Sequence, residues 1–287
     1  MVEWNMKLYV FGDVGGHYYP LAKSLALLGV DIDKGTIPED VHIMQVGDLI
    51  HKGPHSDAVV FLVDELRKTG QWHQLFGNHE MQHLGGQRFF RCSCAHDNII
   101  PVLEKWVEAG DGVLARGVVL DKPHPYFKNK EVLITHAGLT HHQYLSLNQP
   151  NLNSLVQKIN SDVSASVVNR SGVMLQTGFN RQPRPDMYAG IVWAHSTEEL
   201  YPSWEHQTPV FDQVHGHTSP FAFSRHEWWR HVAREWRQRI KVYQEGTRMT
   251  VCTVDEDKSF VGVDPDYDKH AGTEFQPYLE LDIKEIF

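Results

Sequence analysis

The sequence predicts a mixed α/β fold, formed by a single domain over residues 1–287. In the first third of the chain, strand-like and helix-like runs alternate, which is typical of βαβ units around parallel strands. Near the end of the chain, short strand-like runs follow one another directly, which indicates a mixed or two-layer sheet. Of the 287 residues, 41% are hydrophobic, so the chain can bury a sizeable core.

The first third supplies the alternating elements. Pro20 falls in the first turn of one expected helix, where its missing N–H has no partner to lose. Ser56 stands at the expected N-cap of the next helix, and Gly70 marks its end. In chain order, strands are expected at 6–11, 41–46 and 72–76, and helices at 20–30 and 56–70.

The later strands are read from short apolar runs. Two of them, at 131–138 and 210–218, contain a histidine near their end. Three more follow at 248–254, 259–263 and 278–283, and their short connections favour antiparallel pairing. These strands would complete a mixed sheet begun by the first three.

The composition limits the setting in which the protein works. The formal net charge of -9 argues against a surface that coats nucleic acid, although a local basic patch stays open. No apolar run reaches the roughly 20 residues of a membrane-spanning helix, so no membrane partner is expected. The N-terminus has no signal-peptide pattern, and the three cysteines are an odd number, so we expect the reducing cytoplasm. The oligomeric state stays open.

Residues of metal-ligand type follow the expected strands. The carboxyl ends of strands are where α/β sheets bind ligands, so these side chains are expected to meet at one edge. Two divalent ions a few Å apart can clamp a phosphate ester, and they need a bridging carboxylate with oxygen and imidazole ligands around it. The five residues are Asp13, Asp48, Asn78, His136 and His217.

The surrounding motifs carry a resemblance. The chain resembles calcineurin-like metallophosphoesterases, in particular the phosphoprotein-phosphatase and diadenosine-tetraphosphatase branch, from about Met6 to the C-terminal strands. The resemblance implies a central β-sandwich of mixed sheets flanked by helices, a two-metal centre and hydrolysis of phosphate esters. The motifs are "GDVGGH" at 12–17, "GDLIHKGP" at 47–54, "GNHE" at 77–80, "HAGL" at 136–139 and "HGHT" at 215–218.

The resemblance assigns one complete metal site. Asp48 would bridge two ions, and Asn78, His136 and His217 would complete the set of the second ion. His79 would be the general acid that protonates the leaving oxygen. Manganese is the expected ion, with iron, zinc or nickel as alternatives.

The first metal site departs from the family pattern. Asp13 is present, but Gly15 stands where the family has a histidine ligand. Leu21 keeps the family spacing from Asp13, so the chain has no insertion and the ligand has been replaced. His17 would either reach the first ion through the two freely rotating glycines or help to cap the following helix, and both interpretations stay open. We therefore expect the first site to bind weakly.

The second motif also departs. The family has an aspartate that orients the catalytic histidine, and here that position is His51. A neutral imidazole can accept a hydrogen bond from His79 but stabilises an imidazolium less than a carboxylate does. Lys52 replaces a phosphate-gripping arginine, so the charge is kept while the bidentate fork is lost. Lys52 and Asn78 are the expected contacts to the phosphoryl oxygens.

Residues 224–241 have helical spacing and are expected as a basic, tryptophan-rich helical insertion. The basic face would either be solvated or attract a polyanionic substrate. Trp229, Val232, Ala233, Trp236 and Ile240 would form the apolar face, and Arg230, Arg234, Arg237 and Lys241 the basic one.

A further stretch, at 191–202, resembles a family segment in which a tryptophan is followed by an arginine that touches substrate. His195 stands in the place of that arginine, and core packing is the expected role of Trp193.

The expected activity is metal-dependent hydrolysis of phosphate monoesters by a metal-activated hydroxide. One alternative is hydrolysis of dinucleoside polyphosphates or other nucleotides. Another is a mononuclear or catalytically weak relative that binds phosphoryl groups. Phosphorylated proteins, nucleotides and RNA ends all present the same group, so the sequence leaves the substrate open.

Overall fold

The structure is a computed structural model that describes residues 6–85, 98–169, 175–207, 211–267 and 276–287. Two of the three cysteines, Cys92 and Cys94, lie outside these ranges, and Cys252 is a buried free thiol. Within the described residues, no helix is both long and apolar enough to cross a membrane.

The first half of the chain alternates strands with helices, as expected. Its elements are β1 (Met6–Phe11), α1 (Tyr18–Leu27), β2 (Val41–Gln45), α2 (Ser56–Arg67), β3 (Trp72–Leu75), α3 (Asn78–Met81), α4 (Ile100–Glu108), β4 (Gly112–Val113), β5 (Ala115–Leu120) and β6 (Glu131–Thr135).

The second half begins with helices and ends with strands. Its elements are α5 (His141–Leu147), α6 (Leu152–Asn169), a π-helical turn (Ser196–Leu200), α7 (Tyr201–Trp204), β7 (Asp212–His215), β8 (Phe221–Ala222), β9 (Glu227–Trp228), α8 (Arg234–Arg239), β10 (Ile240–Tyr243), β11 (Met249–Asp255), β12 (Lys258–Gly262) and β13 (Tyr278–Ile286).

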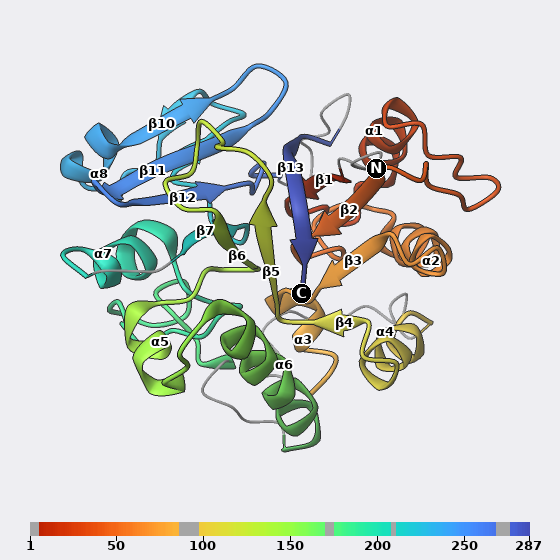
Figure 1. The fold of residues 1–287 in the computed structure, drawn as a ribbon, viewed down its shortest axis with the longest axis horizontal. Helices are drawn as coiled ribbons and strands as arrows, with labels where there is room; N and C mark the ends of the chain where they lie inside the picture. The colour runs from red at the N-terminus through yellow and green to blue at the C-terminus, as the bar shows by residue number, and fades with distance from the viewer. Residues whose placement is uncertain (1–5, 86–97, 170–174, 208–210, 268–275) are drawn as a thin grey trace.

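Eleven strands form one mixed sheet in the order β10-β11-β12-β7-β6-β5-β13-β1-β2-β3-β4, and β8 pairs with β9 apart from it. Strands β1 to β4 run parallel, and so do β6, β7 and β12. The C-terminal strand β13 lies between the two groups and pairs antiparallel with β1 and with β5. Figure 1 shows β1–β3 on one side of β13, and β7 with β10–β12 on the other.

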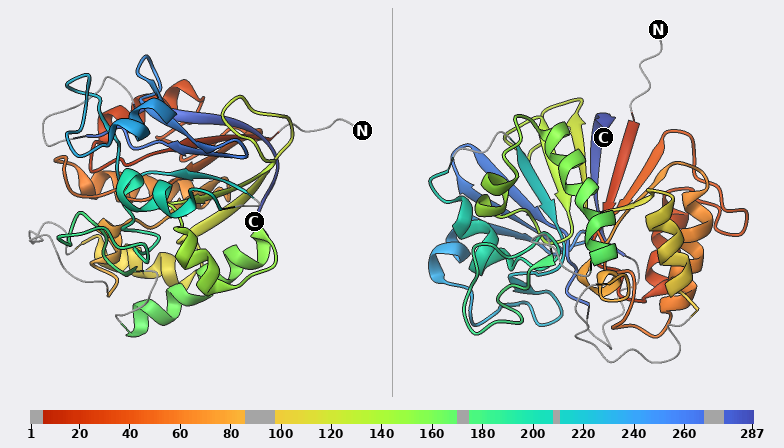
Figure 2. Two further views of the ribbon diagram at one scale, coloured as in Figure 1. Left: turned by 90° about the vertical axis from the view of Figure 1, so that its left-hand side faces the viewer. Right: turned by 90° about the horizontal axis from the view of Figure 1, so that it is seen from below.

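The sheet has two apolar faces, because successive side chains of a strand point to opposite sides. On β1, Leu8 and Val10 belong to one cluster while Tyr9 and Phe11 belong to the other. The first cluster draws on strand residues from both ends of the sheet and on no helix residue among those described, so the sheet curls over and packs against itself. The second packs strands against helices, and Figure 2 shows α5 and α6 along the sheet.

The mixed α/β class with flanking helices is confirmed, and most expected strands occur within a few residues of their predicted bounds. Strand 259–263 pairs antiparallel with β11, as expected, but parallel with β7. The helix expected at 20–30 begins earlier, at Tyr18, and ends at Leu27. The N-cap of α2 is His55 rather than Ser56, whose hydroxyl instead accepts the N–H of His51.

The single helix expected at 224–241 is wrong. Only Arg234–Arg239 is helical; before it the chain forms the β8–β9 hairpin, and after it β10 joins the edge of the large sheet. Val232, Trp236 and Ile240 reach the core from this irregular path, so tertiary packing has overridden the helical spacing. The four basic residues therefore share no helix face.

Candidate metal centre and active site

The predicted site residues meet where the carboxyl ends of five strands converge. In the sheet order, β1–β3 are separated from β6 and β7 by β13 and β5, so the curl of the sheet brings the two groups together. The N–H of Gly216 donates to the carbonyl of His136, and the N–H of His217 donates to Oδ1 of Asp13 at 3.0 Å. Asp13 follows β1, Asp48 follows β2, Asn78 opens α3 after β3, His136 follows β6 and His217 follows β7.

Asp48, His136 and His217 form a group suited to a metal ion. Each offers one ligand atom, and these atoms lie within 4.8 Å of one another. It is the one group of three or more such side chains within the described residues. The amide Oδ1 of Asn78 joins it, 3.1 Å from Nε2 of His136.

The protonation of His136 shows why the group fits a cation. Its Nδ1 donates to the carbonyl of Val46 at 3.0 Å, so its Nε2 carries the unshared pair. Burial lowers the pKa of His136 despite the nearby charges of Asp13 and Glu80, which keeps the ring neutral. Nε2 lies 3.1 Å from the Asn78 oxygen and 3.4 Å from Oδ1 of Asp48. Unshared pairs that converge in this way repel one another unless a cation lies between them.

His217 adds a second imidazole with the same property. Its buried Nε2 has no hydrogen-bond partner among the described atoms. Burial, then the neighbouring charges of His136 and His195, lower its pKa well below the ordinary value. A neutral imidazole, which binds through the unshared electron pair of a ring nitrogen, is the form that binds Mn²⁺, Fe, Ni or Zn²⁺. The residues present therefore fit a divalent ion with mixed oxygen and nitrogen ligands.

The turn that carries Asp48 is held by Glu80. One carboxylate oxygen of Glu80 accepts the N–H groups of Asp48 and Gly77, at 2.8 and 2.9 Å, and the other accepts that of Leu49 at 2.9 Å. Asp48 adopts a left-handed conformation, with φ of 57°. A Cβ at residue 77 would lie 2.1 Å from Oδ1 of Asp48, so only glycine fits there. The backbone thus fixes the Asp48 carboxylate before any ion binds.

The Asp13 side is built differently. Oδ2 of Asp13 is buried, makes no hydrogen bond to any residue that the structure describes, and lies 3.7 Å from Nζ of Lys52. Burial and the charges of Asp264 and Asp48 raise the pKa of Asp13 well above its usual range. His17 packs its ring on Tyr267, with centroids 5.0 Å apart, and its side chain makes no capping hydrogen bond to α1. The metal-suited group includes neither Asp13 nor His17.

His79 and His51 lie in contact. Their Nδ1 atoms are 2.7 Å apart, and Nε2 of His51 lies 3.3 Å from Nε2 of His83. Nε2 of His79 points back toward the metal-suited group, 3.7 Å from Oδ2 of Asp48. Burial, followed by the charges of Lys52 and His51, lowers the pKa of His79 well below its ordinary value. At neutral pH the ring is therefore mostly neutral.

A cavity of about 340 Å³ opens onto this centre. Two of its lining residues, Asn180 and Arg181, were not predicted, because they lie in a segment with no motif and no regular secondary structure. The Arg181 guanidinium lies over the ring of Trp193, 5.8 Å from its centroid. Trp193 is buried, as expected, yet it also lines the cavity. The lining residues are Asp48, Lys52, Asn78, His79, Asn180, Arg181, Trp193 and His217.

Asp264 is a third site residue that the sequence reasoning missed. It lies two residues after the end of β12 and is 5% exposed, and its charge acts on both Asp13 and Lys52. The rule that found the other residues would have found it, since it comes immediately after the expected strand 259–263.

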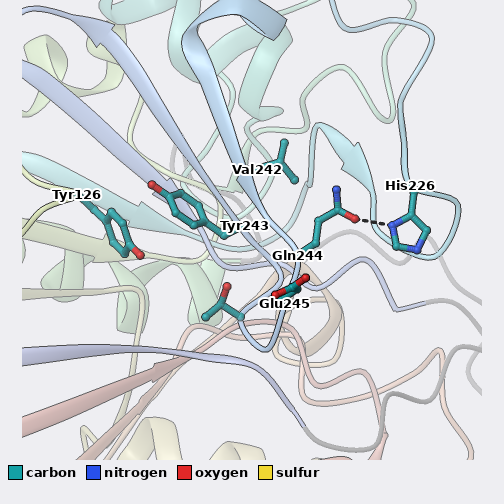
Figure 3. A pocket seen from close by; sticks show the side chains of 7 residues that line it. Tyr126, His226, Val242, Tyr243, Gln244 and Glu245 are labelled. Atoms are coloured by element: carbon teal, nitrogen blue, oxygen red, sulfur yellow. Dashed lines mark hydrogen bonds between the residues drawn. The ribbon is translucent and has the colours of Figure 1, made fainter.

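Another cavity, of about 670 Å³, lies beside the end of β10 (Figure 3). Tyr126 and Tyr243 pack together there, and His226 hydrogen-bonds to Gln244. None of the predicted site residues lines it.

Comparisons with known proteins identify the family and the fold. The model of the calcineurin-like phosphoesterase family matches residues 6–245. No curated protein matches the chain. The fold is similar to that of the cold-active protein-tyrosine phosphatase of the psychrophile Shewanella sp., at 16% identity and a TM-score of 0.53, covering 97% of this chain and 76% of that one.

A protein serine/threonine phosphatase from Saccharomyces cerevisiae is also similar, at 11% identity and a TM-score of 0.48, covering 99% of this chain and 82% of that one. The similarity to the Shewanella phosphatase shows a shared fold, and the family match adds the chemistry. The chain belongs to the calcineurin-like phosphoesterase family, whose members are typically metal-dependent hydrolases of phosphate esters.

Proposed function

We propose that this protein hydrolyses phosphate monoesters with a divalent metal ion held by Asp48, Asn78, His136 and His217. The observation that supports it most is the convergence of unshared pairs around Nε2 of His136. Asp48 and Asn78, two of the groups that meet there, also line a cavity that contains Lys52 and Arg181. When bound there, a divalent ion supplies a hydroxide nucleophile at neutral pH and polarises the phosphoryl group. The chain's own residues supply the rest.

Three side chains of the cavity would position the phosphoryl group. Lys52 and Arg181 bring positive charge, and Asn78 brings an amide beside the metal-suited group. Charges fixed in a water-poor cavity stabilise a developing phosphoryl charge more than they would in water. Arg181 can also present the planar fork that Lys52 lacks.

His79 would help the leaving group to depart. Its Nε2 faces the cavity side of Asp48, while its Nδ1 is engaged by His51. Because the pKa of His79 is lowered, only a small fraction carries a proton at pH 7. The proposed enzyme should therefore work best on esters with good leaving groups, such as aryl phosphates.

We propose Mn²⁺ as the preferred ion, with iron, zinc and nickel as alternatives, because the donor set mixes a carboxylate, an amide and imidazoles. The Asp48 site would fill first. The Asp13 side, which Asp13 and His17 were expected to serve, would bind a second ion weakly, since it offers fewer ligands.

Phosphorylated proteins are the proposed substrates, and a cytoplasmic, single-domain enzyme is the proposed setting. The alternative of a nucleotide substrate rested mainly on the basic helix face expected at 224–241. That stretch has no continuous basic face, and the guanidinium N–H groups of Arg237 donate to the carbonyls of Val232 and Trp229.

A second candidate function is phosphoryl binding with little turnover. It is favoured by the His51–His79 pair, because the partner of His79 Nδ1 is an imidazole and not a carboxylate. With this function, the protein would bind the metal and a phosphate monoester through the same residues but release the ester unchanged.

The test begins with protein stripped by a chelator and reloaded with Mn²⁺, Fe²⁺, Zn²⁺ or Ni²⁺. We expect hydrolysis of an aryl phosphate monoester that needs added metal and is lost in His136→Ala. The matched control is His141→Ala, a histidine outside the site. Calorimetric binding of both metal and inorganic phosphate with no turnover for any ion would replace this proposal with the binding function.

A further inference from the structure

We propose that the ammonium group of Lys52 takes the place of the first metal ion, so that the chain works with one divalent ion and one built-in cation. The inference rests on the proposed function and deepens it. It explains the weak binding of a second ion on the Asp13 side by the presence of Lys52, and not only by the missing histidine ligand.

The side chain of Lys52 packs against Gly15. A Cβ at residue 15 would lie 3.3 Å from both Cβ and Cδ of Lys52, and 3.6 Å from its Cγ. The stem of the lysine therefore packs tightly against the place where a side chain at residue 15 would begin. A histidine at residue 15 would have to displace it.

The backbone fixes this arrangement. The N–H of Gly15 donates to the carbonyl of Asp48 at 2.7 Å, and the N–H of Gly53 donates to the carbonyl of Gly15 at 2.5 Å. These bonds join the turn after β1 to the turn that carries Lys52. Lys52 itself has a φ of 52°, so its direction is set by the turn.

The ammonium lies among carboxylates that need a cation. Nζ of Lys52 is 3.7 Å from Oδ2 of Asp13, the buried oxygen that has no hydrogen-bond partner within the described part of the chain. A buried carboxylate is costly unless a positive charge compensates it. The carboxylates whose charges attract the ammonium are Asp264, Asp13, Asp48 and Asp266.

The two sides of the site therefore take different cations. The Asp48 side combines a carboxylate with imidazole nitrogens and an amide oxygen, the mixed ligand set that suits a divalent ion. The Asp13 side has carboxylates, and no metal-suited group of three side chains found among the described residues includes Asp13. A divalent ion there would compete with Lys52 for the same oxygens and be repelled by its charge.

Lys52 is also placed to act where a first ion would act. It lines the cavity together with Asn78 and His79, so the charge that neutralises Asp13 also faces an incoming phosphoryl group. A lysine brings one positive charge in place of two, and it cannot leave the site when a chelator is added.

The test measures how many ions bind to each chain and does not depend on catalytic activity. Mn²⁺ is titrated into protein stripped of metal, calorimetry and elemental analysis give the number of bound ions, and electron paramagnetic resonance shows whether two ions are coupled. We expect one ion per chain with an uncoupled Mn²⁺ spectrum for the unchanged protein and for Lys52→Arg, which keeps the charge. Lys52→Met, which keeps the stem and removes the charge, should bind a second ion at least about tenfold more tightly than the unchanged protein does.

Two ions per chain with a coupled spectrum in the unchanged protein would overturn the inference, as would a folded Lys52→Met that still binds one. If Lys52→Met does not fold, Asp13→Asn decides. The inference predicts that this variant keeps its single ion, whereas a two-ion centre would drop from two to one. Hydrolysis is measured separately, so the two proposals can fail independently. An active protein with two ions would overturn the role of Lys52 and keep the proposed function, whereas an inactive protein with one ion would keep the role of Lys52 and overturn the proposed function.

Discussion

Nδ1 of His51 lies 2.7 Å from Nδ1 of His79, so the two rings share one hydrogen bond in which only one of the nitrogens can donate. The pair fixes the ring of the proposed acid without supplying it with negative charge. The first two predictions depend on this relationship.

Replacing His51 by aspartate should raise the pKa of His79. A carboxylate at this distance stabilises the imidazolium, whereas the present partner adds to the lowering caused by burial. The variant His51→Asp should therefore hydrolyse an alkyl phosphate faster at pH 7, with the limb of the pH–rate profile that reports the acid moved to higher pH. His51→Asn, which has similar size and no charge, is the control and should leave that limb in place. A shift in both variants would assign the effect to packing.

Replacing His79 by asparagine should cost about 10²–10⁴ in kcat on an ester with a poor leaving group. The loss should be smaller on an aryl phosphate, whose leaving group hardly needs a proton. Steady-state kinetics on both substrates measure the ratio. Equal losses would mean that the His79 side chain holds structure and does not donate a proton to the leaving group.

Binding of one equivalent of Mn²⁺ should raise the melting temperature. The ion separates the unshared pairs of His136, Asn78 and Asp48, and the unfolded chain offers no such site. At 100 times the dissociation constant the gain is about 2.7 kcal/mol. Differential scanning calorimetry with and without chelator measures it. His217→Ala should reduce the gain, and the same gain in this variant would remove His217 from the ligand set.

Arg237→Ala should lower the free energy of unfolding by about 1–2 kcal/mol, since the guanidinium satisfies two backbone carbonyls of the preceding turn. Arg234→Ala on the same short helix is the control and should change little. Neither variant should alter KM, even for a polyanionic substrate across a salt series. A rise in KM for both would revive a substrate-guiding role.

Stability should fall on acidification through a pair of histidines far from the site. Nδ1 of His42 lies 3.2 Å from Nε2 of His73, and burial, with smaller effects of Arg116 and His42, lowers the pKa of His73 to about 4. The unfolded chain has a histidine pKa of about 6.5, so it binds the extra proton first. The stabilising contribution is complete above pH 6.5 and is lost as the pH falls toward 4.

Urea unfolding of stripped protein between pH 4 and 7 measures this loss, which is at most about 1.4 kcal/mol per pH unit for one proton. His73→Gln should flatten the profile in that range, because glutamine does not titrate. An unchanged slope would assign the acid sensitivity to other buried histidines, such as His215, whose burial lowers its pKa to about 4.

The strand ends were the part of the molecule that the sequence predicted best. Each run of apolar residues that stops at an aspartate, asparagine or histidine carries both the strand and its functional side chain, so β2 with Asp48 and β6 with His136 were found together. The same rule applied to the run before Asp264 would have added that carboxylate. It was passed over because no motif surrounds it.

Other features depend on contacts that the sequence does not encode locally. Arg181 reaches the cavity from an irregular segment, and its position follows from its packing over Trp193. The residues from 224 to 241 have helical spacing, yet Trp236 and Ile240 reach the core from two different elements. In both cases the tertiary surroundings, rather than the local pattern, decide the path of the chain.

The position of β13 has a consequence for how the protein folds during its synthesis. This strand is synthesised after every other strand of the sheet, yet it lies between β5 and β1 and joins the half that carries Asp48 to the half that carries His136. On the ribosome, the nascent chain would hold both halves before the strand that aligns them has emerged. Metal acquisition would then wait until β13 has emerged and paired with β1 and β5, and loading would report that the sheet had closed.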